Sequence, residues 1–222
     1  MQQPLPMFDY IIKILPAMLE GTLLSLKIFA VTLVFSLILG WFVSLLRVSR
    51  NRVVSKIVEI YCWFFRGTPL MLQLIFVYYG LPYVSKSLVW EPFTCAVVAF
   101  ILNYVAYFAE IFRGGIESID AGQLEAADVL GLTRRQTMRR IIMPQAVKRV
   151  LPSIGNEVIT LIKDTALVYV IGMHELMRVA QIAVTRDFRI DAFIPAALIY
   201  LLLTYVCTKL QKAVENKFAY YR

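Results

Sequence analysis

The stretch Gly122-Gln123-Leu124-Glu125-Ala126-Ala127, followed by Gly131 and then by Ile141-Ile142-Met143-Pro144, connects two segments that are apolar enough to span a membrane. The residues before Gly131 are mostly good helix formers, and glycine suits the left-handed position that ends a helix. Thr133 with Gln136 three residues later fits a capping box, which starts a new helix. The stretch therefore predicts a helix, a sharp turn and a second helix between two membrane spans.

Apolar segments dominate the rest of the 222-residue chain. Hydrophobic residues make up 59% of it, against about 45–50% in ordinary soluble domains. A bilayer core of about 30 Å needs about 20 apolar residues per helix, and five stretches qualify or nearly qualify. They are Gly21 to Leu46, Thr68 to Val89, Phe93 to Phe112, Leu151 to Ile171 and Ala192 to Cys207. We expect an all-α integral membrane bundle of five transmembrane helices, forming one transmembrane domain over residues 1–222.

The first two apolar stretches carry further signals. No basic residue precedes Gly21 to Leu46 within residues 1–10, and no small-residue cleavage site follows, so this segment is expected to stay in the mature protein. Gly67 and Pro69 interrupt the apolar run that begins near Ile57, which predicts a break there. Residues 47–61 place apolar side chains at helical spacing opposite basic ones, which suits a helix that either continues the first span or lies at the cytoplasmic interface.

Lysine and arginine are distributed unevenly over the connections between these spans. The net charge is +8, and 16 of the 23 basic residues fall on one side of the predicted bundle. These are Arg47, Arg50, Arg52, Lys56, Arg66, Arg113, Arg134, Arg135, Arg139, Arg140, Lys148, Arg149, Lys209, Lys212, Lys217 and Arg222. The positive-inside rule then places the N-terminus outside and the C-terminus in the cytoplasm. The same distribution explains the charge without nucleic acid as a partner.

Signals for catalysis or metal binding are weak. The three cysteines, Cys62, Cys95 and Cys207, are widely spaced in apolar surroundings, and the one histidine, His174, is expected in a loop. The chain has no G-x-x-x-x-G-K-[ST] loop to bind ATP. We therefore expect neither an enzyme nor a metal site, and no cofactor bound by this chain.

Two polar stripes lie within the third and fourth apolar stretches. They are Asn103, Tyr107 and Glu110 on the third, spaced i, i+4, i+7, and Glu157, Thr160 and Asp164 on the fourth, spaced i, i+3, i+7. Each spacing is one helical face, and ionisable groups within a span usually face protein or water. The stripes are expected to line a substrate path, with Asp164 the deepest; the alternative is that Asn103 and Thr160 only hold helices together. Lys163 points elsewhere and needs a partner on another helix.

The stretch from Glu125 to Pro144 closely resembles the coupling loop of permease subunits of ATP-binding-cassette (ABC) importers. That pattern is Glu-Ala-Ala, three residues, Gly, nine residues, Ile, one residue and Leu-Pro, and here Met143 replaces the Leu. The resemblance implies that a loop over about residues 114–150 docks into a groove on an ATPase subunit, which binds ATP and Mg. The docking residues it implies are Glu125, Ala126, Ala127, Gly131, Ile141 and Pro144.

Within these permeases the chain looks like the polar amino-acid type, the histidine/arginine/glutamine permease family. The stretches that carry this similarity are residues 65–70 with Gln73, residues 78–82, 109–116 and 144–146, and Lys163-Asp164-Thr165-Ala166-Leu167. The resemblance implies five transmembrane helices and a dimer of permease subunits in a bacterial inner membrane. It also implies two ATPase subunits and an extracytoplasmic binding protein that delivers an amino acid. Thr165 joins the expected substrate path on this ground.

Alternatives remain open at this stage. An ion-coupled secondary transporter or a channel would use the same intramembrane charges with no ATPase, and an integral-membrane enzyme is a third possibility. For the substrate, Glu110, Glu157 and Asp164 favour arginine, lysine or histidine, whereas Lys163 suits a carboxylate, so glutamine or glutamate also fits. The four arginines between residues 134 and 140 are expected to contact the partner or anionic lipid headgroups.

Overall fold

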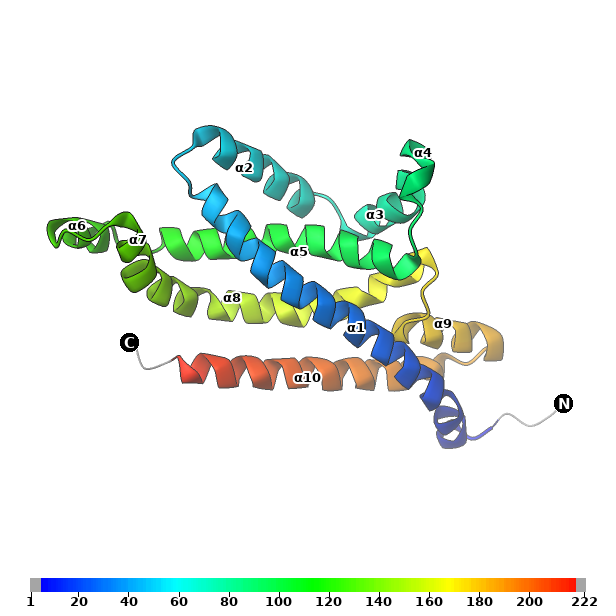
Figure 1. The fold of residues 1–222 in the computed structure, drawn as a ribbon. Helices are drawn as coiled ribbons and strands as arrows, with labels where there is room; N and C mark the ends of the chain where they lie inside the picture. The colour runs from blue at the N-terminus through cyan, green and yellow to red at the C-terminus, as the bar shows by residue number, and fades with distance from the viewer. Residues whose placement is uncertain (1–4, 219–222) are drawn as a thin grey trace.

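A computed structural model describes residues 5–218, and every regular element in that range is helical (Figure 1). Arg222, one of the basic residues counted above, lies outside the described range. The start of α1 (Met7–Arg47) and the end of α10 (Phe193–Lys217) lie at opposite ends of the molecule. This placement agrees with a chain that runs along the bundle an odd number of times.

Small residues bring α1 against α5 (Pro92–Glu117), the helix at the centre of the bundle. The buried face of α1 carries a residue with a short side chain at most turns, among them Gly21, Ser25, Thr32, Ser36, Gly40 and Ser44. A Cβ at Gly40 would lie 2.7 Å from Cβ of Phe108 on α5, so the two backbones approach closely. Small interface residues are typical of helix packing in membranes. Buried Phe100, Tyr104 and Phe108 of α5 fill the core around this contact.

The second apolar stretch is broken where the sequence predicted a break. α2 (Arg52–Gly67) is capped by Asn51, whose side chain accepts hydrogen bonds from the amides of Val53 and Val54, so it is a separate helix rather than a continuation of α1. At Gly67 the chain bends by 100°. Four short pieces follow: α3 (Leu70–Ile75), the π-helical η1 (Phe76–Gly80), α4 (Leu81–Val84) and the 3-10 turn η2 (Lys86–Leu88). Helical structure thus runs without a break from Leu70 to Val84, and is shorter than the apolar stretch from Thr68 to Val89.

The fourth apolar stretch also changes character along its length. α8 (Met143–Asp164) gives way to the 3-10 helix η4 (Thr165–Ile171), a tighter helix, and at this junction the Thr165 hydroxyl donates to the carbonyl of Ile162. Gly172, with φ of 80°, ends η4. A bend of 53° leads into α9 (Leu176–Asp187), and the short turn η5 (Ile190–Ala192) precedes α10. α10 reaches Lys217, beyond the predicted end at Cys207, and His174 lies in the loop before α9 as predicted.

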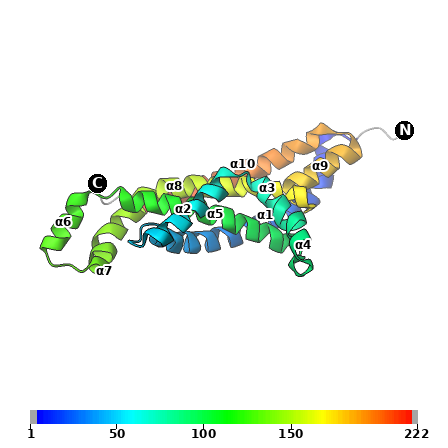
Figure 2. The same cartoon turned by 90° about the horizontal axis from the view of Figure 1, so that it is seen from above.

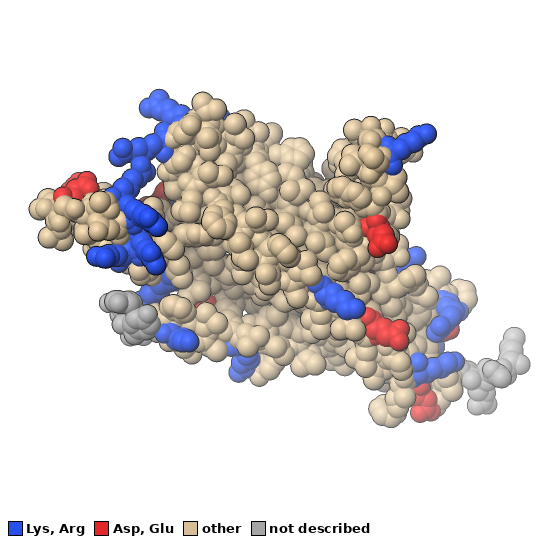
Figure 3. All heavy atoms as spheres, in the orientation of Figure 1, with Lys and Arg blue, Asp and Glu red and all other residues tan. Residues whose placement is uncertain are grey.

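The remaining elements form an outlying hairpin at one end of the bundle (Figure 2). They are α6 (Ala121–Val129), α7 (Arg134–Thr137) and the π-helical turn η3 (Met138–Ile142), which runs into α8. Lysine and arginine side chains gather at this end, near the hairpin and the start of α2 (Figure 3). Three helices, α1, α5 and α10, are long and apolar enough to cross a membrane, and the two bent pairs bring the candidates to as many as five. The chain is thus an all-helical, multi-pass membrane protein.

Candidate functional site

A polar cavity of about 440 Å³ lies at the bend that follows α2. Its lining comes from the bend itself, from α5, from α8 and from the first turn of η4. The lining residues are Arg66, Gly67, Thr68, Pro69, Leu70, Asn103, Tyr104, Tyr107, Glu157, Thr160, Asp164 and Leu167. The structure thus brings together five of the seven residues predicted from the two polar stripes and from the resemblance. The exceptions are Glu110 and Thr165.

Asp164 is held in place within this cavity by a residue that the sequence did not single out. Its Oδ2 accepts a hydrogen bond of 2.7 Å from the hydroxyl of Tyr104, which is itself buried on α5. Within residues 5–218, neither Asp164 nor Glu157 forms an ion pair with an arginine or lysine side chain. Two carboxylates therefore face the cavity from one side of α8, each without an arginine or lysine within ion-pair distance in the described residues.

Asn103 fixes the bend that forms the opposite wall. Its Nδ2 donates to the carbonyl of Phe65 at 3.0 Å and to Oε1 of Gln73 at 3.1 Å. The Gln73 amide in turn donates to the carbonyls of Phe65 and Thr68. Carbonyls at the end of a helix have no partner within that helix, so this network satisfies them where α2 stops. Asn103 is thus an interhelical contact as well as a lining residue, whereas the Thr160 hydroxyl donates to the Asn156 carbonyl of its own helix.

Arg66 is the cationic counterpart of the two carboxylates, although the sequence pattern indicates only a basic residue in the first connection. Its guanidinium lies 5.3 Å from the centre of the Tyr107 ring and 3.7 Å from Glu110. The break signal at Gly67 and Pro69 was the available clue, because a charged side chain beside a broken span faces an internal space more readily than lipid. The cavity therefore presents one cation opposite two anions.

Glu110 lies outside the cavity in a cluster of ion pairs that joins three helices. Its carboxylate is 2.7 Å from Arg113 on α5, 3.7 Å from Arg47 at the end of α1 and 3.7 Å from Arg66 on α2. Arg47 is also 3.3 Å from Glu59. The spacing i, i+7 from Asn103 correctly predicted the face of α5 on which Glu110 lies. Glu110 is, however, two turns further along the helix than Asn103, where it pairs with the arginines instead of lining the cavity.

Thr165 and Lys163 also lie away from the cavity. Thr165 is fully buried, with its hydroxyl bonded to the backbone of Ile162. Lys163 is exposed, and the partner on another helix that the sequence predicted is absent among residues 5–218.

The α6–α7 hairpin has the local geometry that the sequence predicted. Asp120 caps α6 by accepting from the Gly122 amide at 2.7 Å, and Gly131 adopts a left-handed conformation with φ of 69°. The Leu132 amide donates to the Ala127 carbonyl at 3.0 Å, which closes the end of α6. Thr133 and Gln136 form the complete capping box at the start of α7.

The hairpin exposes an apolar tip together with most of the predicted docking residues. Val129 and Leu130 are adjacent in the sequence, at the end of α6, and are 88% and 75% exposed. Glu125, Ala126, Gly131 and Pro144 are exposed, Ile141 is half-buried and Ala127 is buried. Ile141 and Pro144 line a separate cavity of about 730 Å³ between Gln123 of α6 and the η3–α8 segment. An exposed apolar turn between two capped helices suits insertion into a groove.

Bent helices around a charged cavity, beside apolar helices of membrane-spanning length, define a helical membrane transport subunit. Comparison with known proteins gives the family. The chain belongs to the binding-protein-dependent transport system inner membrane components, whose family pattern matches residues 15–220. It is therefore a transport permease and not an enzyme.

Two curated relatives are similar over nearly the whole chain. The arginine transport system permease protein ArtQ of Bacillus subtilis (strain 168) is 43% identical over 211 residues, which are 95% of this chain and 96% of that protein. The probable amino-acid ABC transporter permease protein PatM of Vibrio harveyi is 39% identical over 212 residues and covers 95% of each chain.

Solved structures show the same architecture. A crystal structure of an amino acid ABC transporter with histidines superposes with a TM-score of 0.88 at 34% identity, covering 97% of this chain and 100% of that chain. An inward-facing structure of the MetNI methionine ABC transporter gives a TM-score of 0.78 at 16% identity, covering 91% of this chain and 96% of that chain. The second likeness concerns the fold alone.

Proposed function

We propose that this chain is the permease subunit of an ATP-driven importer of amino acids, with a cationic amino acid as substrate. The observation that carries the proposal is the cavity in which Glu157 and Asp164 face Arg66. An amino acid with a cationic side chain has two positive groups and one carboxylate, which is the complement of this charge pattern. The relatives named for arginine and amino-acid transport, and the transporter solved with histidines, support the same class.

The proposed topology has five spans, of which the two bent pairs provide the second and fourth. The N-terminus lies outside and the C-terminus in the cytoplasm of a bacterial inner membrane, in agreement with the basic residues at the end where the hairpin lies. Residues 1–222 form one transmembrane permease domain. The second permease subunit is a copy of this chain or a related one, and an extracytoplasmic binding protein delivers the amino acid.

The proposed coupling element is the α6–α7 hairpin within residues 114–150. Glu125, Ala126, Ala127, Gly131, Ile141 and Pro144 form or support its contact with an ABC ATPase subunit, which holds ATP and Mg. Closure of the ATPase dimer draws the two hairpins together, and the bundle then rocks around the cavity, as alternating access requires.

The substrate proposal is tested by Asp164→Asn in the purified transporter. Removing one of two carboxylates is expected to weaken arginine-stimulated ATPase activity at least tenfold and glutamine-stimulated activity less than threefold, because only arginine has a second positive charge to place. Glu91→Ala is the matched control, since Glu91 is exposed and its side chain makes no cap contact at the start of α5. Equal losses for arginine and glutamine would refute the charge argument.

The coupling proposal is tested by co-purification from membranes. Tagged wild-type chain should bring a stoichiometric ATPase subunit, and Glu125→Ala combined with Gly131→Pro should lose it, whereas Glu91→Ala should keep it. If no protein with a nucleotide-binding loop accompanies the wild type, an ion-coupled transporter without an ATPase becomes the better assignment.

A further inference from the structure

A second cavity, at the hairpin end of the bundle, carries a strong positive charge. It measures about 700 Å³ and lies between the end of α1 and the α7–η3 turn. Four arginines line it: Arg50, Arg134, Arg135 and Arg139. No acidic residue lines it, and within residues 5–218 none of these four side chains forms an ion pair or hydrogen bond. Four unpaired guanidinium groups around one cavity favour an anionic ligand.

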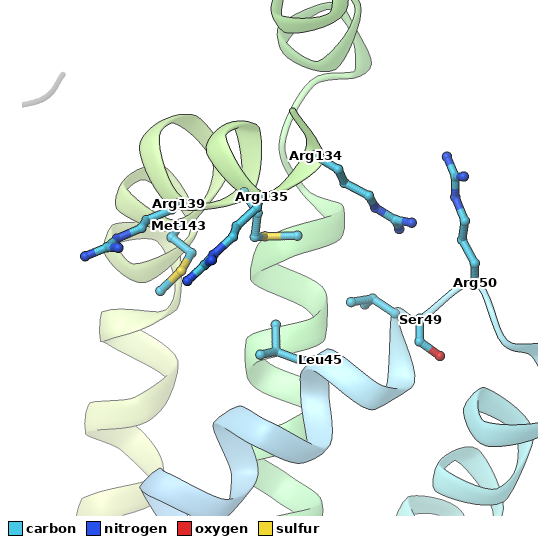
Figure 4. Close-up of a pocket in the computed structure, with 9 residues that line it drawn as sticks. Leu45, Ser49, Arg50, Arg134, Arg135, Arg139 and Met143 are labelled. Carbon is cyan, nitrogen blue, oxygen red and sulfur yellow. The ribbon is translucent and has the colours of Figure 1, made fainter. Parts of the chain in front are cut away.

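The arginines come from two walls that face each other across the opening. In Figure 4 the Arg134 side chain extends toward Arg50, while Arg135 lies beside Met143 and Arg139 extends outward on the far side. Arginine binds phosphate through paired N–H groups in a planar fork. Groups on both walls can therefore contact the oxygens of one phosphate from different directions.

The acidic side chains nearby leave this charge largely uncompensated. An adjoining cavity shares Arg50 and Arg134 and has Glu117 and Asp128 in its lining. Glu117 is already paired with Arg113. Arg135 and Arg139 line the first cavity, and neither Glu117 nor Asp128 is part of its wall.

The floor of the cavity is apolar and continues along α1 toward the membrane. Leu45 and Ser49 line the cavity, and Ile38 and Phe42 precede them at i−7 and i−3 from Leu45, which is one helical face. Ile38 and Phe42 are 51% and 59% exposed. The ligand site thus combines a cationic head region with an apolar track on a helix long enough to span the bilayer.

We propose that this cavity binds the phosphate headgroup of an anionic phospholipid from the cytoplasmic leaflet, with its acyl chains along the Ile38–Phe42 face of α1. A cytoplasmic protein partner can satisfy the arginines but cannot reach that face within the membrane. Basic pockets beside transmembrane helices on the cytoplasmic side are suited to such headgroups. The site adds a lipid contact between α1 and the hairpin, and so would link the membrane composition to the position of the hairpin.

The test measures lipid binding to the transporter as it is purified from membranes in mild detergent. The probe is a short-chain fluorescent phosphatidylglycerol. Competitors are dioleoylphosphatidylglycerol, dioleoylphosphatidylcholine and glycerol 3-phosphate, which carries the phosphate without acyl chains. We expect displacement by phosphatidylglycerol and no displacement by the other two at equal concentration. Displacement by glycerol 3-phosphate as strong as by phosphatidylglycerol would make this a site for free phosphate and overturn the proposal.

Matched variants locate the site. Arg50→Gln with Arg135→Gln removes one arginine from each wall and should weaken phosphatidylglycerol binding about 30-fold. The control pair, Arg52→Gln with Arg140→Gln, removes the same charge from neighbouring positions that do not line the cavity, and should weaken binding less than threefold. Equal weakening in both pairs would indicate diffuse attraction and overturn the proposal, as would unchanged binding in the first pair.

Two further readouts separate the lipid site from other roles of the arginines. Loss of the ATPase subunit from the first pair, with lipid affinity unchanged, would mean that the arginines contact the ATPase instead. If the glutamine pair does not fold, Arg50→Lys with Arg135→Lys replaces it. Lysine keeps the charge but lacks the planar fork, so binding should weaken about 3- to 10-fold; unchanged binding would overturn the proposal.

Discussion

Gly21→Ala should destabilise the protein although alanine favours helices more than glycine. Gly21 is buried within α1, and a Cβ added there would lie 2.9 Å from the carbonyl carbon of Glu175 and 2.9 Å from the amide nitrogen of Leu176. Both are backbone atoms at the start of α9, so no side-chain rotation relieves the contact. Forcing extra volume into a packed site costs about 1–3 kcal/mol, whereas alanine gains about 1 kcal/mol over glycine in a helix interior.

Gly114→Ala on α5 is the matched control, because it lies within a helix and a Cβ there meets nothing within 4 Å. Gly114→Ala gains the same helix propensity without the steric overlap, so the unfolding free energies of the two variants should differ by about 1–3 kcal/mol. At about 2–4 °C per kcal/mol, a difference of about 2 kcal/mol separates their melting temperatures by about 4–8 °C. Tryptophan fluorescence during heating of the detergent-purified chain measures this. A Gly21→Ala protein that melts at or above Gly114→Ala would refute the reasoning.

Substitutions at three other positions test the ion-pair cluster around Glu110, the start of α9 and the hairpin. Glu110→Gln should lower the free energy of unfolding by about 2 kcal/mol, which is below the about 3–5 kcal/mol for breaking a fully buried ion pair. Arg47 still pairs with Glu59 and Arg113 with Glu117, so among the three arginines Arg66 alone loses its ion pair. An unchanged melting temperature would contradict a stabilising role for the cluster. Glu175→Ala should cost about 2–4 kcal/mol, since the buried carboxylate accepts from two amides of α9 and the Tyr200 hydroxyl, and Glu175→Gln should cost less than half as much. Thr133→Ala should remove about 1 kcal/mol of local capping energy, seen as about fivefold faster amide hydrogen exchange at Gln136 with little change in melting temperature; a large global shift would speak against a peripheral hairpin.

The hairpin and the polar stripes could be predicted from the sequence because both depend on local rules. Gly131 and the Thr133–Gln136 capping box act within a few residues, and the structure has both as predicted. The stripe on α8 follows from helical periodicity alone, so Glu157 and Asp164 share a cavity. The five apolar stretches were likewise visible in composition, and the structure confirms their helical character while leaving as many as five candidate spans.

The sequence did not predict the positions of Arg66 and Glu110, because these depend on how the broken helices pack against their neighbours. Periodicity treats a helix as straight, but α2 stops at a 100° bend, and Arg66 in its last turn lies against Tyr107 and Glu110, which no spacing rule within α2 can specify. This contact changes the role of Glu110, because an acid on the correct face of α5 becomes a partner for three arginines rather than part of the cavity wall. Arg66 both lines the cavity, where it lies against Tyr107, and pairs with Glu110 in the ion-pair cluster. A movement of α2 that accompanied transport would therefore change the charge facing the substrate and the ion pairs between α1, α2 and α5 in a single step.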